Sequence, residues 1–290
     1  MNLEEFNRWC VDYQVSHQRG VAPPRPIVMG IINVTPDSFS DGGNSNQDDA
    51  VRRAQAMVES GADMLDIGGE ATNPYAESVS VEEELARVIP VIKAIRSQSD
   101  ICISIDTSKS AVMQSAIDAG ADFINDITAL SGEGALFVAK KYDAPACLMH
   151  MKGTPKTMQI APQYGSVVDD VDAFFGARIN ACVQYGLKRE RLILDPGFGF
   201  GKTVSHNLVL LKRISAFKHY GLPILLGVSR KSTLGAILKT ETMGRLVGGL
   251  AASVYAVLQG VSILRTHDVF ETHQALQMIS AIVDINESGA

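Results

Sequence analysis

The chain has 290 residues, of which 46% are hydrophobic and 20% are charged, and its formal net charge at pH 7 is −6. This length is enough for one large core. The acidic balance provides no basic surface for a phosphate backbone, so we expect no nucleic-acid partner. No apolar run approaches the roughly 18 residues that span a bilayer, and residues 1–18 lack the layout of a signal peptide. We therefore expect a cytoplasmic protein with no membrane partner.

The four cysteines are widely spaced along the chain, at Cys10, Cys102, Cys147 and Cys182. No Cys-x-x-Cys pair and no paired histidines are present to complete a zinc site. Cys102 and Cys147 lie inside apolar runs, where cysteine behaves as a small hydrophobic residue. We expect both to pack in the core of a reduced protein.

Short apolar runs alternate with longer amphipathic segments from residue 27 onward, which is typical of βα units that build a parallel sheet. The runs are near-continuously apolar, as strands buried on both faces should be, and cover 27–32, 64–67, 101–105, 123–124, 146–149, 192–194, 224–227 and 262–264. The segments between and after them have a helical period and cover 49–60, 81–96, 110–119, 134–141, 167–185, 206–217, 243–259 and 269–286.

Eight strand–helix pairs over about 260 residues predict a single-domain α/β fold, the closed (β/α)₈ or TIM barrel, over residues 27–290. Residues 1–26 end in Pro23-Pro24-Arg25-Pro26. They are predicted to form an N-terminal helix and an extended lead-in, and Trp9 is expected to anchor this segment against the barrel.

The loops after the predicted strands are where a barrel of this kind places its active site. Polar residues do follow each strand, namely Asn33, Asp66 with Glu70, Asp106, Asn125 with Asp126, His150, Asp195, Ser229 to Lys231, and Arg265 with His267. Any one of them alone would be an ordinary solvated loop residue. The whole ring predicts a site for a polar heterocycle that carries an anionic group.

Cations gather after the last two strands. Ser229-Arg230-Lys231-Ser232 follows the seventh strand and is predicted to open a helix, whose free N–H groups favour an anion. Arg265 and His267 follow the eighth strand, so we expect a positive wall. The glycine-rich segment 197–202 lets the backbone approach a ligand closely, but its spacing is not that of a nucleotide-binding loop.

Seven motifs in this order resemble those of the dihydropteroate synthase family. Residues 29–43, MGIINVTPDSFSDGG, resemble the first family motif, and residues 66–70, DIGGE, resemble the start of the second. The others are SIDT at 104–107, NDI at 125–127, LDPGFGFGK at 194–202, SRKS at 229–232 and RTHD at 265–268. The resemblance extends from about residue 27 to residue 285, so it covers the whole predicted barrel.

The resemblance implies a transferase of folate biosynthesis. The family condenses (7,8-dihydropterin-6-yl)methyl diphosphate with p-aminobenzoate, releases pyrophosphate and forms 7,8-dihydropteroate by an SN1-like path. It uses Mg²⁺, is a target of sulfonamide analogues of p-aminobenzoate, and tends to form homodimers through its later helices. Here residues 243–259, which include Gly248-Gly249, would pack in that interface.

The resemblance also implies a role for each matching residue. The pterin pocket would contain Asp106, Asn125, Met149, Asp195 and Lys231. Pyrophosphate would be bound by Asn33, Thr72, Arg265 and His267, with Asn33 also a ligand of Mg²⁺. The p-aminobenzoate site would contain Phe39, Pro74, Phe200, Lys202 and Ser229. The catalytic residues would be Asp106, Lys231, Arg265 and His267.

The second loop departs from the family pattern. The family commonly has Glu-Ser-Thr-Arg-Pro, whereas this chain has Glu70-Ala71-Thr72-Asn73-Pro74, so the loop lacks its arginine. Two alternatives stay open: a catalytically silent pterin-binding protein, and a relative of the pterin-dependent methyltransferases. The second has no need of a pyrophosphate pocket, and the corrinoid domain it works with does not fit in this length.

Because Asn73 brings no charge, we expect Asn73→Ala to change the rate of dihydropteroate formation only slightly. Lys231→Ala removes a cation from the mouth and should lower the rate by roughly a hundredfold. Steady-state kinetics of the two purified variants measure the difference. An equally severe loss in Asn73→Ala would contradict the prediction.

Overall fold

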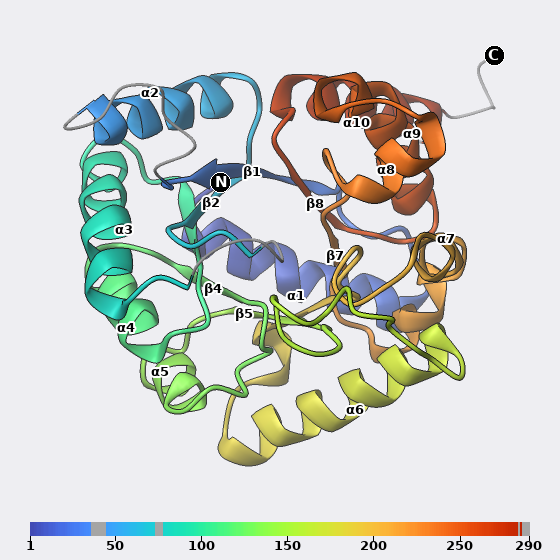
Figure 1. The fold of residues 1–290 in the computed structure, drawn as a ribbon, viewed down its shortest axis with the longest axis horizontal. Helices are drawn as coiled ribbons and strands as arrows, with labels where there is room; N and C mark the ends of the chain where they lie inside the picture. Colours follow the sequence, from blue (N-terminus) through green and yellow to red (C-terminus); the bar gives the residue numbers. More distant parts are fainter. Residues whose placement is uncertain (36–44, 73–77, 284, 286–290) are drawn as a thin grey trace.

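Eight parallel strands form the centre of the structure (Figure 1). The structure is a computed structural model that describes residues 1–35, 45–72, 78–283 and 285. The strands are β1 (Ile27–Asn33), β2 (Met64–Gly68), β3 (Cys102–Asp106), β4 (Phe123–Asp126), β5 (Ala146–Met149), β6 (Leu192–Asp195), β7 (Leu225–Leu226) and β8 (Ile263–Thr266). Their order in the sheet is β6-β5-β4-β3-β2-β1-β8-β7, and a parallel bridge between Leu194 and Ile224 joins β6 to the start of β7. The predicted (β/α)₈ barrel is confirmed.

Helices surround the strands (Figure 1). They are α1 (Leu3–Arg19), α2 (Ser45–Glu59), α3 (Val81–Arg96), α4 (Ser110–Asp118), α5 (Ala135–Lys141), α6 (Val167–Tyr185), α7 (Val204–Lys212), α8 (Ser232–Leu238), α9 (Leu246–Leu258) and α10 (Val269–Val283), with short 3₁₀ helices at Arg189–Arg191, Ile214–Tyr220 and Thr242–Arg245. None of these helices in the described part of the chain is long and apolar enough to cross a bilayer.

Two segments that were predicted as single continuous helices are each divided in two, so these predictions were wrong. The segment 206–217 divides into α7 and a 3₁₀ helix, because Arg213 leaves the helical region with φ −113° and ψ 21°. The segment 243–259 divides into a 3₁₀ turn and α9. The predicted helices 81–96 and 167–185 are confirmed residue for residue, and Ser80 and Ser166 cap their amino ends with their side chains.

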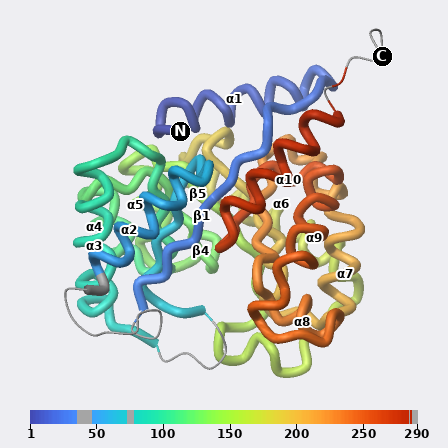
Figure 2. The backbone as a smooth tube through the Cα atoms, turned by 90° about the horizontal axis from the view of Figure 1, so that it is seen from above, coloured from blue at the N-terminus to red at the C-terminus, as the bar shows by residue number. Residues whose placement is uncertain are grey.

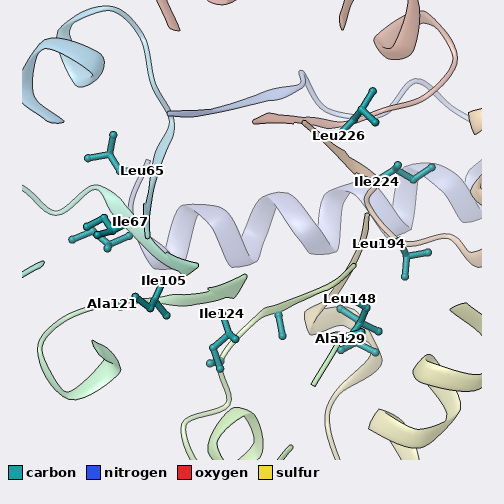
Figure 3. Close-up of a cluster of buried hydrophobic side chains, with 14 of the residues drawn as sticks. Leu65, Ile67, Ile105, Ala121, Ile124, Ala129, Leu148, Leu194, Ile224 and Leu226 are labelled. Atoms are coloured by element: carbon teal, nitrogen blue, oxygen red, sulfur yellow. The ribbon is translucent and has the colours of Figure 1, made fainter. Parts of the chain in front are cut away.

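The outward-facing row of strand residues packs against the helices. Leu65 and Ile67 on β2, Ile105 on β3 and Leu194 on β6 belong to this layer, and all four are fully buried (Figure 3). Burying one such side chain contributes about 1.5–3 kcal/mol to stability. This layer therefore holds the helical ring on the barrel.

The inward-facing row at the amino ends of the strands forms a separate apolar floor, made of Ile27, Met29, Met64, Cys102, Phe123, Cys147, Ile193, Leu225 and Ile263. Helix α1 lies across this end of the barrel (Figure 2). It contributes Phe6, whose ring meets that of Phe123 edge to face at 5.6 Å, and Trp9, whose Nε1 donates to the carbonyl of Arg25 at 2.9 Å. Trp9 is buried in this helix, and all four cysteines are buried and free.

Candidate active site

The strand residues that follow the floor place polar side chains inside the opposite end of the barrel. Asp66 and Ser104 lie two residues beyond Met64 and Cys102, and the register pairs Met64 with Cys102 and Asp66 with Ser104. Side chains alternate along a strand, so Asp66 and Ser104 point inward like the floor residues. The same parity turns inward Asn33, Asp106, Asn125, Met149, Asp195 and Arg265.

Asp66 is the centre of this polar layer, and its side chain is fully buried. One carboxylate oxygen accepts from Ser104 Oγ at 2.5 Å, and the other accepts from Asn125 Nδ2 at 3.0 Å and Arg265 Nε at 2.6 Å. The same guanidinium reaches Asp106 through Nη2 at 2.7 Å. One cation therefore joins two carboxylates and ties β8 to β2 and β3.

The charges of this cluster shift one another's pKa values. Burial raises the pKa of Asp106, and the neighbouring Asp66 adds to the rise, while Arg265 opposes it. Burial alone would lower the pKa of Arg265, but Asp66 and Asp106 outweigh it, so the net shift is upward. Arg265 thus stays charged in a half-buried position, where it can stabilise an anion.

Asp195 and Lys231 face the same interior from β6 and the amino end of α8. Asp195 Oδ1 accepts from the backbone N–H of Gly197 at 2.7 Å. Lys231 Nζ donates to the carbonyl of Phe198 and lies 4.7 Å from the ring centroid of Phe200. Burial lowers the pKa of Lys231 to about 8, against the effect of Asp195. A carboxylate, an amine and an aromatic ring are brought together here.

His267 and Ser229 lie beside each other at the ends of β8 and β7. The backbone N–H of His267 donates to Ser229 Oγ at 3.3 Å, Ser229 Oγ donates to Asp268 at 3.2 Å, and Arg230 pairs with Asp268 at 2.6 Å. Burial lowers the pKa of His267 to about 4, and Arg265, Arg230 and Arg53 add to the fall. His267 is therefore neutral at pH 7, so the positive charge of the expected wall comes from the arginines.

Lys202 lies inside the glycine-rich loop. Its side chain is 3% exposed, and Nζ lies 2.9 Å from His150 Nδ1 and from the carbonyls of Gly197 and Phe200. Burial lowers the pKa of Lys202 to about 7 and that of His150 to about 3. Contact between Lys202 and p-aminobenzoate stays a prediction. Apart from three closely spaced glycines before a lysine, no pattern in the chain pointed to this buried pair.

The remaining predicted site residues differ in burial, and some of them lie outside the described residues. Met149 is buried in register with Asp195, Thr72 is half-buried after β2, and Phe200 is half-buried. Phe39, Pro74 and Asn73 lie outside the described residues. The central role of Asp66 was not predicted from the sequence. Asp66 lies two residues after the apolar Met64 on the same strand, which predicts that both side chains point into the barrel.

The described residues contain no group of three or more His, Cys, Asp or Glu side chains that could hold a metal ion. The predicted protein ligand of Mg²⁺, Asn33, offers a single neutral amide oxygen at the end of β1. Hard cations accept such oxygens but need several more ligands, which oxygens of a bound anion and water can provide.

The fold and the site define a barrel enzyme that binds a polar ring and an anion at the carboxyl ends of its strands. A family model described as "Pterin binding enzyme" matches residues 29–267. The dihydropteroate synthase of Escherichia coli strain K12 is 51% identical over 264 residues, which are 91% of this chain and 94% of that protein. The chain belongs to the pterin-binding enzymes and, within them, to the dihydropteroate synthase family.

Solved structures of the family have the same fold. Yersinia pestis dihydropteroate synthase with a sulfonamide drug complex is 48% identical, with a TM-score of 0.86, and the match covers 90% of this chain and 95% of that one. The Xanthomonas albilineans enzyme with 4-aminobenzoic acid is 44% identical, with a TM-score of 0.87, and covers 91% and 95%. Their barrel and this one correspond over nearly the whole chain.

Asp66→Asn removes the charge that Arg265 meets on β2 and should lower catalytic turnover by roughly ten- to a hundredfold, because Arg265 is no longer held in place. We also expect a lower free energy of unfolding, by about 3–5 kcal/mol. Asp122→Asn is the matched control, since Asp122 pairs with Arg96 at 2.5 Å near the start of β4, away from the site. It should lose stability but keep its turnover. Steady-state kinetics and urea unfolding measure both, and equal losses of turnover would contradict the assignment.

Proposed function

We propose that the protein condenses (7,8-dihydropterin-6-yl)methyl diphosphate with p-aminobenzoate to give 7,8-dihydropteroate and pyrophosphate, as a step of folate biosynthesis. The observation that carries this proposal is the bridge from Arg265 to Asp66 and Asp106 at distances of 2.6 and 2.7 Å. It holds a half-buried cation between the carboxylates and amide of the polar layer and the side chains of His267 and Arg230.

The pterin is proposed to bind among the inward-facing side chains of Asp106, Asn125, Met149, Asp195 and Lys231. Asp195 is 7% exposed and keeps one oxygen on Gly197, so its other oxygen can accept from the amino and ring N–H edge of a pterin. Charged acceptors make the stronger hydrogen bonds in such pairings. Met149 would supply a polarisable contact to the face of the ring.

The diphosphate is proposed to lie toward Asn33, Thr72, Arg265 and His267. Arg265 would carry the positive charge, and the neutral His267 would donate one hydrogen bond. A Mg²⁺ ion held by the Asn33 amide oxygen would neutralise charge on the leaving group.

The reaction is proposed to follow an SN1-like path. The bond between the pterin methylene carbon and the diphosphate oxygen breaks, and its electron pair leaves with pyrophosphate beside Arg265. The resulting cation is delocalised into the dihydropterin, and Asp106 stabilises it. The amine of p-aminobenzoate then attacks the carbon and releases one proton. The chain thus needs no strong base, and its residues act by orientation and charge.

For p-aminobenzoate we propose a site between Phe200 and Ser229, with Lys202 near it and with Phe39 and Pro74 completing it. Lys231 lies over the Phe200 ring, which supports an aromatic ligand on this side. The Xanthomonas albilineans structure contains 4-aminobenzoic acid, and the Yersinia pestis structure a sulfonamide drug complex. We propose that this chain binds both kinds of molecule.

The test uses the purified chain with both substrates, with Mg²⁺ and with a chelator. We expect dihydropteroate and pyrophosphate in equal amounts with Mg²⁺, and a large loss of both with the chelator. Mass spectrometry of the pteroate and a pyrophosphate assay measure this. Pterin binding without either product would instead identify a silent pterin-binding protein, and methyl transfer from methyltetrahydrofolate would identify the methyltransferase relative.

We propose further that the enzyme is a cytoplasmic homodimer. Apolar side chains on and before α9 are exposed, with Met243 at 79% and Val247 at 78%. Gly248, by contrast, faces its own chain, because a Cβ there would lie 2.5 Å from Leu238 of α8. The dimer surface is therefore proposed to use the side of α9 that carries Val247.

Val247→Glu puts a charge on that surface and should convert the dimer to a monomer, because an unpaired charge cannot be buried cheaply. Val11→Glu on α1 is the control, since Val11 is also exposed, at 49%, at the far end of the barrel. Sedimentation equilibrium measures the mass. A monomeric parent protein, or an unchanged dimer in Val247→Glu, would disprove this interface.

A further inference from the structure

The ammonium group of Lys202 forms the centre of the loop that joins β6 to α7. Besides its three contacts at 2.9 Å, Nζ lies 3.3 Å from the carbonyl of His150. Three carbonyl oxygens and an imidazole nitrogen thus surround a side chain that is 3% exposed. A fully enclosed ammonium has no face left for a ligand.

The backbone of residues 197–201 is shaped around this group. Gly197, Gly199 and Gly201 have φ values of 66°, 87° and 64°, a region that favours glycine. At Gly197 a Cβ would lie 1.8 Å from the carbonyl oxygen of His150. The loop therefore wraps closely around Nζ and has no room for a larger residue there.

Other side chains hold the outside of the same loop. Asn207 accepts from the N–H of Gly199 at 2.8 Å, Gln159 donates to the carbonyl of Gly199 at 2.7 Å, and the Tyr164 hydroxyl donates to the carbonyl of Gly201 at 2.8 Å. These contacts come from α7 and from the segment before α6. Lys202 holds this loop from inside and the three side chains hold it from outside. We call residues 197–202, fixed in this way, the platform.

Three groups of the proposed site depend on this platform. The N–H of Gly197 holds one oxygen of Asp195, the carbonyl of Phe198 accepts from Lys231, and the ring of Phe200 lies under Lys231. A shift of the loop would displace a carboxylate, an amine and an aromatic ring together. A misplacement of about 1 Å can cost a hundredfold in rate.

We propose that Lys202 is a positioning residue, which fixes the loop that orients Lys231, Phe200 and Asp195 and does not itself touch p-aminobenzoate. This role rests on the proposed function. A positioning role accounts for the direction of the Lys202 side chain, whose Nζ points into its own loop. A contact with the carboxylate of p-aminobenzoate would require Nζ to leave its four partners.

The charge state of Lys202 supports the same role. Burial lowers its pKa to about 7; Lys231 on the α8 side adds to the fall, and Asp195 on β6 opposes it. His150, at the end of β5, is a neutral acceptor, because burial together with Lys202 and Lys152 lowers its pKa to about 3. Below the pKa of Lys202 the ammonium offers three N–H donors; above it the amine offers two for the same acceptors. The platform should loosen as the pH rises through this pKa.

The experiment compares Lys202→Met with the parent enzyme on two acceptors, p-aminobenzoate and the uncharged p-aminobenzamide. A positioning role predicts that kcat/KM falls by roughly ten- to a hundredfold on both, because the loop orients groups that either acceptor needs. The ratio of the two kcat/KM values should stay the same. Lys140→Met is the matched control, since Lys140 Nζ also donates to a backbone carbonyl, that of Tyr185 at 3.1 Å, but between α5 and the end of α6, outside this loop, and it should keep the parent rate.

The pH profile is the second measurement. In the parent enzyme kcat/KM for p-aminobenzamide should begin to fall near pH 7 and fall again near pH 8, where Lys231 titrates. Lys202→Met should lack the first step and keep the second. Near-UV circular dichroism checks folding, and if the methionine variant does not fold, Lys202→Arg decides by the same ratio of acceptors.

A loss confined to p-aminobenzoate would show that Lys202 contacts the carboxylate and would overturn the proposal. Parent-like rates in Lys202→Met on both acceptors would also overturn it. Failure of the proposed function itself is separate, because it would appear as an inactive parent enzyme with either acceptor.

Discussion

The double ion pair of Arg265 is the interaction on which the rest of the site depends. It joins residues 199 positions apart in the chain, and with Asn125 on Asp66 it connects four strands of the barrel. Buried charges are costly unless they are paired, so this arrangement is stable only when the strands are in their observed register. The strand register of the barrel and the ion pairs of Arg265 therefore form together.

Much of the fold was predictable because it follows from local pattern. Eight apolar runs and the helical periods between them predicted the barrel, and the helices 81–96 and 167–185 begin and end at the predicted residues. The break at Arg213 was not predictable, because the segment keeps its apolar pattern while the backbone changes from α to 3₁₀ geometry. Hydrophobic period alone does not separate these two kinds of helix.

The candidate site was predictable as a ring of polar residues but not as a set of roles. Position after a strand placed Asp106, Asn125, Asp195 and Arg265 at one end, because parallel strands share their carboxyl ends. The contacts of Asp66 and Lys202 depend on which way each side chain turns once the barrel is closed. Lys202 and Lys231 both lie in loops after a strand, so their sequence positions do not distinguish their roles. In the structure Lys202 is enclosed by its own loop, whereas Lys231 faces the ring of Phe200.

The apolar floor beneath the site has a consequence for how such an enzyme can change over generations. Phe6 and Phe123 seal one end of the barrel, whereas the polar side chains stand at the other end on the same inward row. The apolar packing and the polar side chains thus lie at different depths of the barrel interior. Replacements on the loops above this polar layer leave the apolar floor untouched, so these loops can change with little loss of folding stability.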